Sequence, residues 1–209
     1  MIAPPERSPE RDAAIDALLA RVPSQGWTRP ALRGALADIG AHPDDAGLLF
    51  PGGAADLVEA FIDLTDRRMA DAAAAPGFAE LRVPARVRAL IAHRLELLRP
   101  HREAVRRALA VLAMPRHAAL AARCAARTVD AIWHAAGDRS ADFSWYTRRA
   151  SLGAVYAATL LFWLRDFSED EAATLAFLDR RLADIGRVTA LRKRIERGCA
   201  RLLPKREAA

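Results

Sequence analysis

Fifteen consecutive residues late in the chain, Ala150–Leu164, carry no charge. Two arginines precede the run, and Arg165 and Asp166 follow it. A run of this length is shorter than the roughly 18 apolar residues that cross a bilayer. It predicts instead a helix that is buried on nearly every side. Because such a helix is stable only when other surfaces cover it, the rest of the chain must supply those surfaces.

A second helix is predicted directly after this run. Ser168 can serve as its N-cap, and Glu171, three residues later, can complete a capping box. Elsewhere Ala, Leu and Arg dominate the 209 residues, and no stretch alternates apolar and polar residues for long. A chain of this length buries about 70% of its unfolded surface, so it can form a sizeable core. We therefore expect an all-α bundle of about nine helices.

The N-terminal part, residues 8–76, follows a segment at residues 1–7 that is predicted to be disordered. Helix signals cover residues 8–22, 29–39, 43–50 and 54–73, with Ser8 and Thr28 as N-caps. This order of a helix, a helix–turn–short helix and a long helix resembles the helix-turn-helix of TetR-type regulators. The resemblance covers residues 12–60.

The chemistry of the short helix argues against DNA binding. A recognition helix needs donors for phosphates and base edges. Residues 41–53, AHPDDAGLLFPGG, offer two Asp and no Arg or Lys, and residues 28–58 contain two Arg against four Asp. Two carboxylates facing the phosphate backbone would repel it. A helix-turn-helix kept as scaffold fits better, and a TetR-type ligand-responsive regulator is the alternative.

The central part, residues 77–186, is predicted to be a helical bundle. The apolar periodicity predicts amphipathic helices over residues 83–98, 102–114 and 117–136. The apolar stripe of the first of these helices includes Arg94. Many alanines line these helices. A helix face lined by alanine leaves more interior volume unfilled than a face lined by leucine. An internal apolar cavity is therefore expected.

No catalytic or metal-binding motif is found. None of the five His forms a Glu-x-x-His pair of the di-iron type, and the Asp and Glu residues stand beside Arg at helical spacings, as on solvated faces. Cys124 and Cys199 match no metal spacing. A disulfide framework is not expected from them, which favours a reducing compartment. The first residues include acids and prolines where a signal peptide would be basic and apolar, so we expect a cytoplasmic protein. We expect no enzyme, no metal and no cofactor.

The C-terminal tail, residues 187–209, carries the whole net charge of +6. Apolar residues recur in it at steps of three and four, and cations surround them. This pattern is typical of an amphipathic helix that lies in an anionic membrane interface. The alternative is a stripe packed on the bundle with solvated charges. The residues predicted to bind the membrane are Leu191, Arg192, Lys193, Arg194, Ile195, Arg197 and Leu202.

Residues 137–181 match a pattern that is specific to one family. The fixed elements include Trp145-Tyr146-Thr147, Val155-Tyr156, Trp163-Leu164 and Phe177-Leu178-Asp179-Arg180-Arg181. In these elements the chain resembles the ubiquinone-biosynthesis accessory proteins often called Coq-nine. The match is dense over residues 130–181.

The resemblance implies a TetR-like fold without nucleic-acid binding and a homodimer formed through the last bundle helices. It also implies binding of isoprenoid quinone intermediates or phospholipid, attachment to the inner membrane as a peripheral protein, and presentation of those lipids to the di-iron hydroxylase of demethoxyubiquinone. The partner patch corresponds here to Ile132, Trp133, Asp142, Trp145, Tyr146 and Arg149. The residues expected to line the lipid pocket are Leu152, Val155, Tyr156, Leu160 and Phe162, and the sequence does not sort them between pocket, core and dimer interface.

Overall fold

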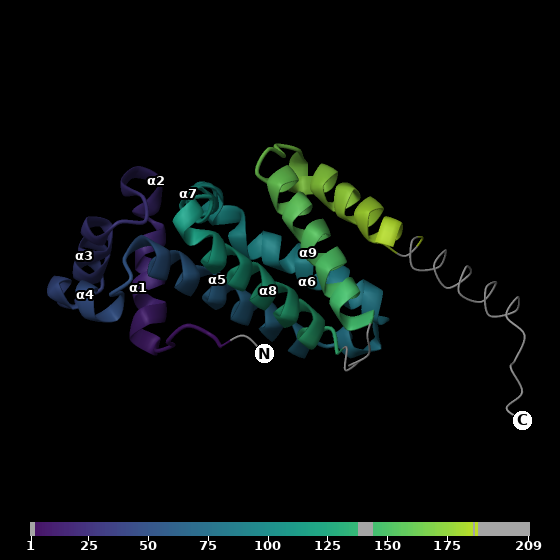
Figure 1. Ribbon diagram of the computed structural model, residues 1–209, viewed down its shortest axis with the longest axis horizontal. Coiled ribbons are helices and arrows are strands. Elements are labelled where there is room, and N and C mark those ends of the chain that lie inside the picture. The colour runs from purple at the N-terminus through teal and green to yellow at the C-terminus, as the bar shows by residue number, and fades with distance from the viewer. Residues whose placement is uncertain (1–2, 138–143, 186, 188–209) are drawn as a thin grey trace, which may run out of the picture. The chain divides into compact units, whose positions relative to one another are not determined.

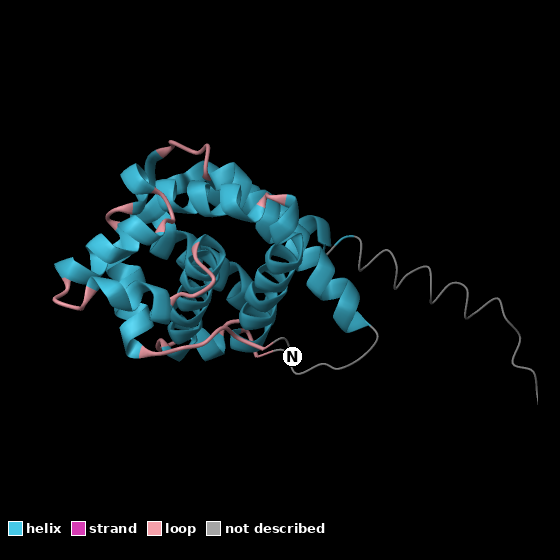
Figure 2. Cartoon of the chain, turned by 60° about the vertical axis from the view of Figure 1, so that its left-hand side comes forward, coloured by secondary structure: helices cyan, strands magenta, loops and turns pink. Residues whose placement is uncertain are grey.

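The computed structural model describes residues 3–137, 144–185 and 187, with the side chains of all these except 144–148. Throughout these ranges the regular structure is helical, without a strand (Figure 2). No helix within them has the length and apolar character that crossing a bilayer requires. The chain divides into two compact units, Met1–Gly153 and Ala154–Ala209, and each is described by itself.

The first unit begins with three helices and a short helical pair. These elements, labelled in Figure 1 where there is room, are α1 (Pro9–Leu19), α2 (Val22–Gln25), α3 (Arg29–Asp38), η1 (Pro43–Asp45) and α4 (Ala46–Leu49). Ser8 caps α1 and Thr28 caps α3, each through a side chain that accepts a backbone N–H, as the sequence predicts. The helix, helix–turn–short helix order is therefore present.

Longer helices complete this unit. They are α5 (Ala54–Asp71), η2 (Ala72–Ala74), η3 (Phe78–Glu80), α6 (Val83–Leu98), η4 (Arg99–His101), α7 (Arg102–Leu112), η5 (Pro115–His117) and α8 (Ala118–Ala135). Helix α5 is central, because it packs against α1, α6, α7 and α8. The bounds of α6 agree with the predicted helix, and those of α7 and α8 differ from prediction by one or two residues. The buried Trp27 donates its indole N–H to the carbonyl of Ala104, 3.1 Å away, and joins α7 to the segment before α3.

The last described elements are α9 (Ser144–Trp163), which runs from the first unit into the second, η6 (Glu169–Glu171) and a helix over residues 172–185. The prediction that residues 150–164 are buried on nearly every side is wrong for the single chain. Leu161 is 59% exposed and Phe162 is 37% exposed. Helix α9 therefore has one buried stripe and one open side.

Two further expectations differ from the structure. The sequence predicts disorder over residues 1–7, whereas the Ala3 carbonyl and the Arg7 side chain make specific contacts with α8 and α5. The capping box is also wrong: Glu171 does not reach back to the backbone N–H of Ser168, which instead donates to Asp166. Ser168 is nevertheless the N-cap residue, as predicted, and its hydroxyl accepts from the backbone N–H of Ala173 at 3.2 Å. Asp166 assists it by accepting from the backbone N–H of Thr174 at 2.7 Å.

Candidate functional site

The residues predicted to line a lipid pocket divide into two groups on α9. Leu152, Val155, Tyr156 and Leu160 are all buried and recur at steps of three, one and four, which places them on one side of the helix. The fifth, Phe162, is on the open side. The structure therefore brings four of the five residues into one stripe and separates the last.

Phe162 instead takes part in an aromatic pair of the second unit. Its ring stacks on that of Phe177, with 4.7 Å between the ring centroids. The guanidinium of Arg181 lies 5.5 Å from the Phe177 centroid. Leu161 precedes Phe162 and is 59% exposed, and Phe167, which lies between the two rings in the sequence, is 87% exposed. These side chains give the second unit an exposed apolar surface. The uncharged sequence of α9 did not indicate which of its apolar residues belong to this surface and which to the buried stripe.

A compact hydrogen-bond network closes the connection after α9. One carboxylate oxygen of Asp166 accepts from the backbone N–H and hydroxyl of Ser168, and the other accepts from the same two groups of Thr174, at distances of 2.6 to 2.9 Å. Burial raises the pKa of Asp166, but these four hydrogen bonds outweigh it and hold the pKa well below its usual value. The network fixes the start of the helix over residues 172–185.

The same connection holds a buried acid. Trp163 is fully buried, and its indole N–H donates to Oε1 of Glu171 at 2.6 Å. The backbone at Asp170 and Glu171 has φ values of 50° and 58°, in the left-handed region that non-glycine residues rarely adopt. Sequence reasoning assigned Glu171 to a cap. The signal that could have corrected this is Trp163 itself, because a buried indole needs an acceptor nearby.

The predicted partner patch is described only in part. Ile132 is fully buried, and Trp133 is half-buried. The indole nitrogen of Trp133 is shielded from solvent and has no hydrogen-bond acceptor among the described residues. Arg149 on α9 donates to Asp130 on α8 at 2.5 Å, which links the two helices of the patch. Trp145 and Tyr146 lie in the first turn of α9. Asp142 lies outside the described residues, as do the seven tail residues predicted to bind the membrane.

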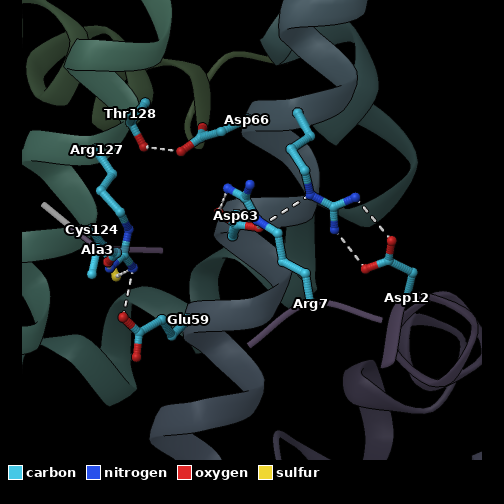
Figure 3. Close-up of polar contacts among 10 residues, drawn as sticks. Ala3, Arg7, Asp12, Glu59, Asp63, Asp66, Cys124, Arg127 and Thr128 are labelled. Carbon is cyan, nitrogen blue, oxygen red and sulfur yellow. Dashed lines mark hydrogen bonds and ion pairs between the residues drawn. The ribbon is translucent and has the colours of Figure 1, made fainter. Parts of the chain in front are cut away.

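A polar layer inside the first unit was missed by the sequence analysis, which placed the acids on solvated faces. Asp66 on α5 accepts from Nε of Arg94 on α6 at 2.9 Å and from the hydroxyl of Thr128 on α8 at 2.7 Å, and all three side chains are buried (Figure 3 shows Asp66 and Thr128). Burial raises the pKa of Asp66 above its usual value, although Arg94 and Thr128 oppose that effect. The signal was Arg94, a cation in an otherwise apolar stripe.

The helix-turn-helix-like part presents acids where a DNA reader would present donors. Asp44 in η1 pairs with Arg33 of α3, and this pair holds the pKa of Asp44 below its usual value. Within the described residues, no cluster of three or more His, Cys, Asp or Glu side chains is arranged to hold a metal ion. Arg11 of α1 is buried, donates to the Leu49 carbonyl and to Asp56 on α5, and lies 4.2 Å from the centroid of the Phe50 ring. These contacts fix α4 to α1 and α5.

Comparison with known proteins connects this arrangement to one family. Residues 118–189 match the family model described as COQ9. The chain is 35% identical over 177 residues to the "Ubiquinone biosynthesis protein COQ9, mitochondrial" of Drosophila melanogaster, which covers 82% of this chain and 54% of that protein. It is 33% identical over 177 residues to the protein of the same name from Homo sapiens, covering 81% of this chain and 55% of the relative.

The chain thus spans about half the length of the curated relatives that it matches. Among solved structures it is similar to the TetR transcriptional regulator from Nitrosomonas europaea, with a TM-score of 0.68 and 28% identity over 84% of this chain and 97% of the other. The resemblance predicted from residues 130–181 is therefore confirmed: the chain carries a COQ9-family domain at residues 118–189 on a TetR-like, all-helical fold.

Proposed function

We propose that this chain is a non-enzymatic, lipid-binding accessory protein of ubiquinone biosynthesis. The observation that carries the proposal is the similarity, over most of the chain, to relatives named as ubiquinone biosynthesis proteins. The matched domain at residues 118–189 includes α8, α9 and the helix over residues 172–185. The proposed ligands are isoprenoid quinone intermediates or phospholipid, which the protein takes up at the membrane and presents to the di-iron hydroxylase.

The buried stripe of α9 is the proposed lipid-facing surface. Its residues are apolar, apart from the hydroxyls of Tyr156 and Thr159, and the whole segment Ala150–Leu164 has no charged residue. Such a surface suits a polyprenyl chain, because burying apolar area stabilises a complex by about 25 cal/mol per Å². The same composition offers no carboxylate, imidazole or amine for acid–base chemistry, which supports a binding role.

Lipid extraction from the purified protein, followed by mass spectrometry, tests this assignment. Enlarging Val155 or Leu160 to Phe should reduce the isoprenoid or phospholipid recovered per protein. Leu161→Phe is the matched control, because it adds the same ring on the open side of the same helix. Circular dichroism checks that all three variants fold. Recovery of no lipid from the parent protein, or equal recovery from all variants, would remove the pocket from the proposal.

The basic tail is the proposed membrane anchor, and it places the protein at the cytoplasmic face of the inner membrane. Each Lys or Arg close to an anionic surface contributes about 1 kcal/mol to binding. Replacing Arg192, Lys193, Arg194 and Arg197 by Glu should therefore abolish flotation with vesicles that contain anionic lipid. Flotation of the parent on purely zwitterionic vesicles measures the apolar contribution. Unchanged flotation of the reversed variant would exclude the tail as the anchor.

The surface formed by α8 and the start of α9 is the proposed docking site for the hydroxylase. Aromatic residues are common anchors of protein interfaces. Trp145→Ala combined with Tyr146→Ala should abolish co-purification with the hydroxylase and leave the thermal unfolding midpoint unchanged. Loss of the fold would show instead that the pair belongs to the core.

The open side of α9 is the proposed homodimer surface. Leu161 and Phe162 expose apolar side chains there, and Phe167 exposes one in the connection that follows α9. Single soluble chains rarely leave large apolar patches uncovered. Light scattering should give the mass of two chains. Phe167→Glu should shift the protein to the mass of one chain, whereas Glu169→Gln on the same connection should not.

A TetR-type ligand-responsive regulator is the second candidate, because the similar solved structure is named as a TetR transcriptional regulator. The charge of the helix-turn-helix-like part opposes it, since η1 contains Asp44 and Asp45 and neither η1 nor α4 contains Arg or Lys. A gel shift with genomic DNA fragments at low and high salt decides between the two. Binding that weakens steeply with salt would revive the regulator.

A further inference from the structure

The irregular segment before α1, residues 3–7, lies against α5 and α8 and is called the N-terminal strap here. Two arginines hold it (Figure 3). Arg7 donates two hydrogen bonds to the carboxylate of Asp63 on α5, at 2.8 and 2.6 Å. At the other end of the strap, Nη1 of Arg127 on α8 donates to the carbonyl of Ala3 at 3.2 Å. The strap is thus attached at both ends by polar contacts.

The groups that hold the strap each have a second partner on the helices. Asp63 also accepts from Nε of Arg67, one turn along α5, at 3.1 Å. Arg127 also donates to Glu59 on α5 at 2.6 Å. Release of the strap therefore leaves neither the buried Asp63 carboxylate nor the Arg127 guanidinium without a charge partner. Because an orphaned buried charge is the main penalty for breaking such contacts, the penalty here is small.

The strap itself buries little surface. Four of its five residues are exposed, and the side chain of Arg7 keeps 47% of its accessible area. Segments with few buried contacts and exposed polar bonds are those that open locally while the rest of a protein stays folded. The consecutive prolines Pro4 and Pro5 restrict the released strap to extended shapes, so it is already suited to rebinding.

We propose that the N-terminal strap is a latch that opens as a unit, with the helices intact, and thereby gives solvent access to the α5–α8 seam at Cys124. Cys124 is 2% exposed. Its sulfur lies 3.5 Å from Nη2 of the same guanidinium that holds Ala3 through Nη1. The Ala3 end of the strap and the Cys124 thiol therefore share one guanidinium, so the reactivity of the thiol reports on opening of the latch. Burial raises the pKa of this thiol to about 11, which keeps it unreactive while the latch is closed.

The experiment measures how fast an aromatic disulfide reagent, dithionitrobenzoate, modifies Cys124 in the full chain with Cys199→Ser as background. The Cys124 thiolate attacks the reagent disulfide, forms a mixed disulfide and releases one thionitrobenzoate, whose absorbance is followed. Arg7→Ala should raise the rate about tenfold, because it removes the bidentate contact that closes the latch. Sodium chloride at 1 M should raise the rate of the parent and leave that of Arg7→Ala nearly unchanged, since salt screens the Arg7–Asp63 ion pair, whose arginine is half exposed.

Arg68→Ala is the matched control. Arg68 lies on α5, as Asp63 does, and pairs with Asp16 of α1 at 2.6 Å. This ion pair does not include a residue of the strap. Its substitution should leave the thiol rate unchanged. Low concentrations of urea separate local from global opening, because the local step exposes little surface and its rate should depend weakly on urea. A rate in Arg7→Ala equal to that of the parent would overturn the latch. A thiol rate that depends on urea as steeply as global unfolding does would also overturn the latch. If Arg7→Ala does not fold, the salt test decides, and a parent rate that salt leaves unchanged would overturn the latch.

Discussion

The indole nitrogen of Trp163 lies 2.6 Å from Oε1 of Glu171, and both side chains are buried. This bond ties the last residue of α9 to the end of η6, across a connection whose backbone has positive φ at Asp170 and Glu171. A non-glycine residue in that region is disfavoured by about 1–3 kcal/mol unless the surroundings hold it there. The Trp163–Glu171 bond is one of the contacts that hold it.

Removing the acceptor should therefore destabilise the fold. Glu171→Ala removes the acceptor of a hydrogen bond from the buried indole N–H, which costs about 1–3 kcal/mol. Urea denaturation measures the change in the free energy of unfolding. Glu169→Ala is the control, because this neighbouring acid is exposed and its loss should change the stability by less than about 0.5 kcal/mol. Equal effects of the two substitutions would show that the buried bond contributes nothing.

The Asp166 network should make stability depend on pH. Its hydrogen bonds lower the pKa of Asp166 in the folded state, despite the opposing effect of burial. The carboxylate therefore stabilises the fold at neutral pH, and this contribution declines as the pH falls below about 4, the unfolded-state pKa, towards the folded-state value. Asp166→Asn should lower the free energy of unfolding at pH 7 by about 2 kcal/mol. The difference between the parent and Asp166→Asn should shrink between pH 4 and pH 2, and a pH-independent difference would contradict the assignment.

The buried Asp66–Arg94 pair should show strong coupling. Asp66→Leu removes the carboxylate that accepts from Nε of the buried Arg94 and should cost about 3–5 kcal/mol. Adding Arg94→Met should recover a large part of that loss, because two apolar side chains of similar size need no charge partner. A double-mutant cycle by urea denaturation measures the coupling. Additive effects would show that the pair does not act as a unit.

The contrast between what was predicted and what was missed follows from the range of the interactions. Ser8, Thr28 and the bounds of α6 could be predicted because caps and helical periodicity depend on residues three or four apart. The partners Asp66 and Arg94 are 28 residues apart, so only the packing of α5 against α6 brings them together. Periodicity indicated that Arg94 faces the core and gave no means of choosing its partner.

The division of α9 into a buried stripe and an open side was missed for a different reason. Periodicity identifies a buried face through the contrast between polar and apolar residues. The run Ala150–Leu164 offers no charged residue to mark the other face. Leu160 and Leu161 are identical in sequence terms, yet the first is 9% exposed and the second 59%. Only the tertiary structure distinguishes them.

Two tryptophans allow a matched test of the partner patch. Trp133 and Trp163 both shield an indole nitrogen from solvent, but that of Trp133 has no acceptor, whereas that of Trp163 donates to Glu171. A buried donor without a partner costs about 1–3 kcal/mol, so replacing it by an apolar ring of similar shape removes that penalty. Trp133→Phe should therefore leave the free energy of unfolding unchanged or raise it by up to about 1 kcal/mol, after the loss of ring area is included. Trp163→Phe should lower the free energy of unfolding by about 2 kcal/mol, because it removes the donor of a buried hydrogen bond to a carboxylate.

The unpaired donor of Trp133 also has a consequence for the proposed hydroxylase complex. If an acceptor on the hydroxylase receives a hydrogen bond from the Trp133 indole N–H, Trp133→Phe should weaken binding about tenfold. This factor corresponds to about 1.4 kcal/mol, as expected for one hydrogen bond in a desolvated interface. Calorimetric titration with the purified hydroxylase measures this affinity, and Trp163→Phe serves as the comparison, since its nitrogen already has a partner within the chain. Weaker binding of Trp133→Phe at unchanged stability would assign the indole N–H to the interface. A stable variant with the affinity of the parent would assign Trp133 to packing alone.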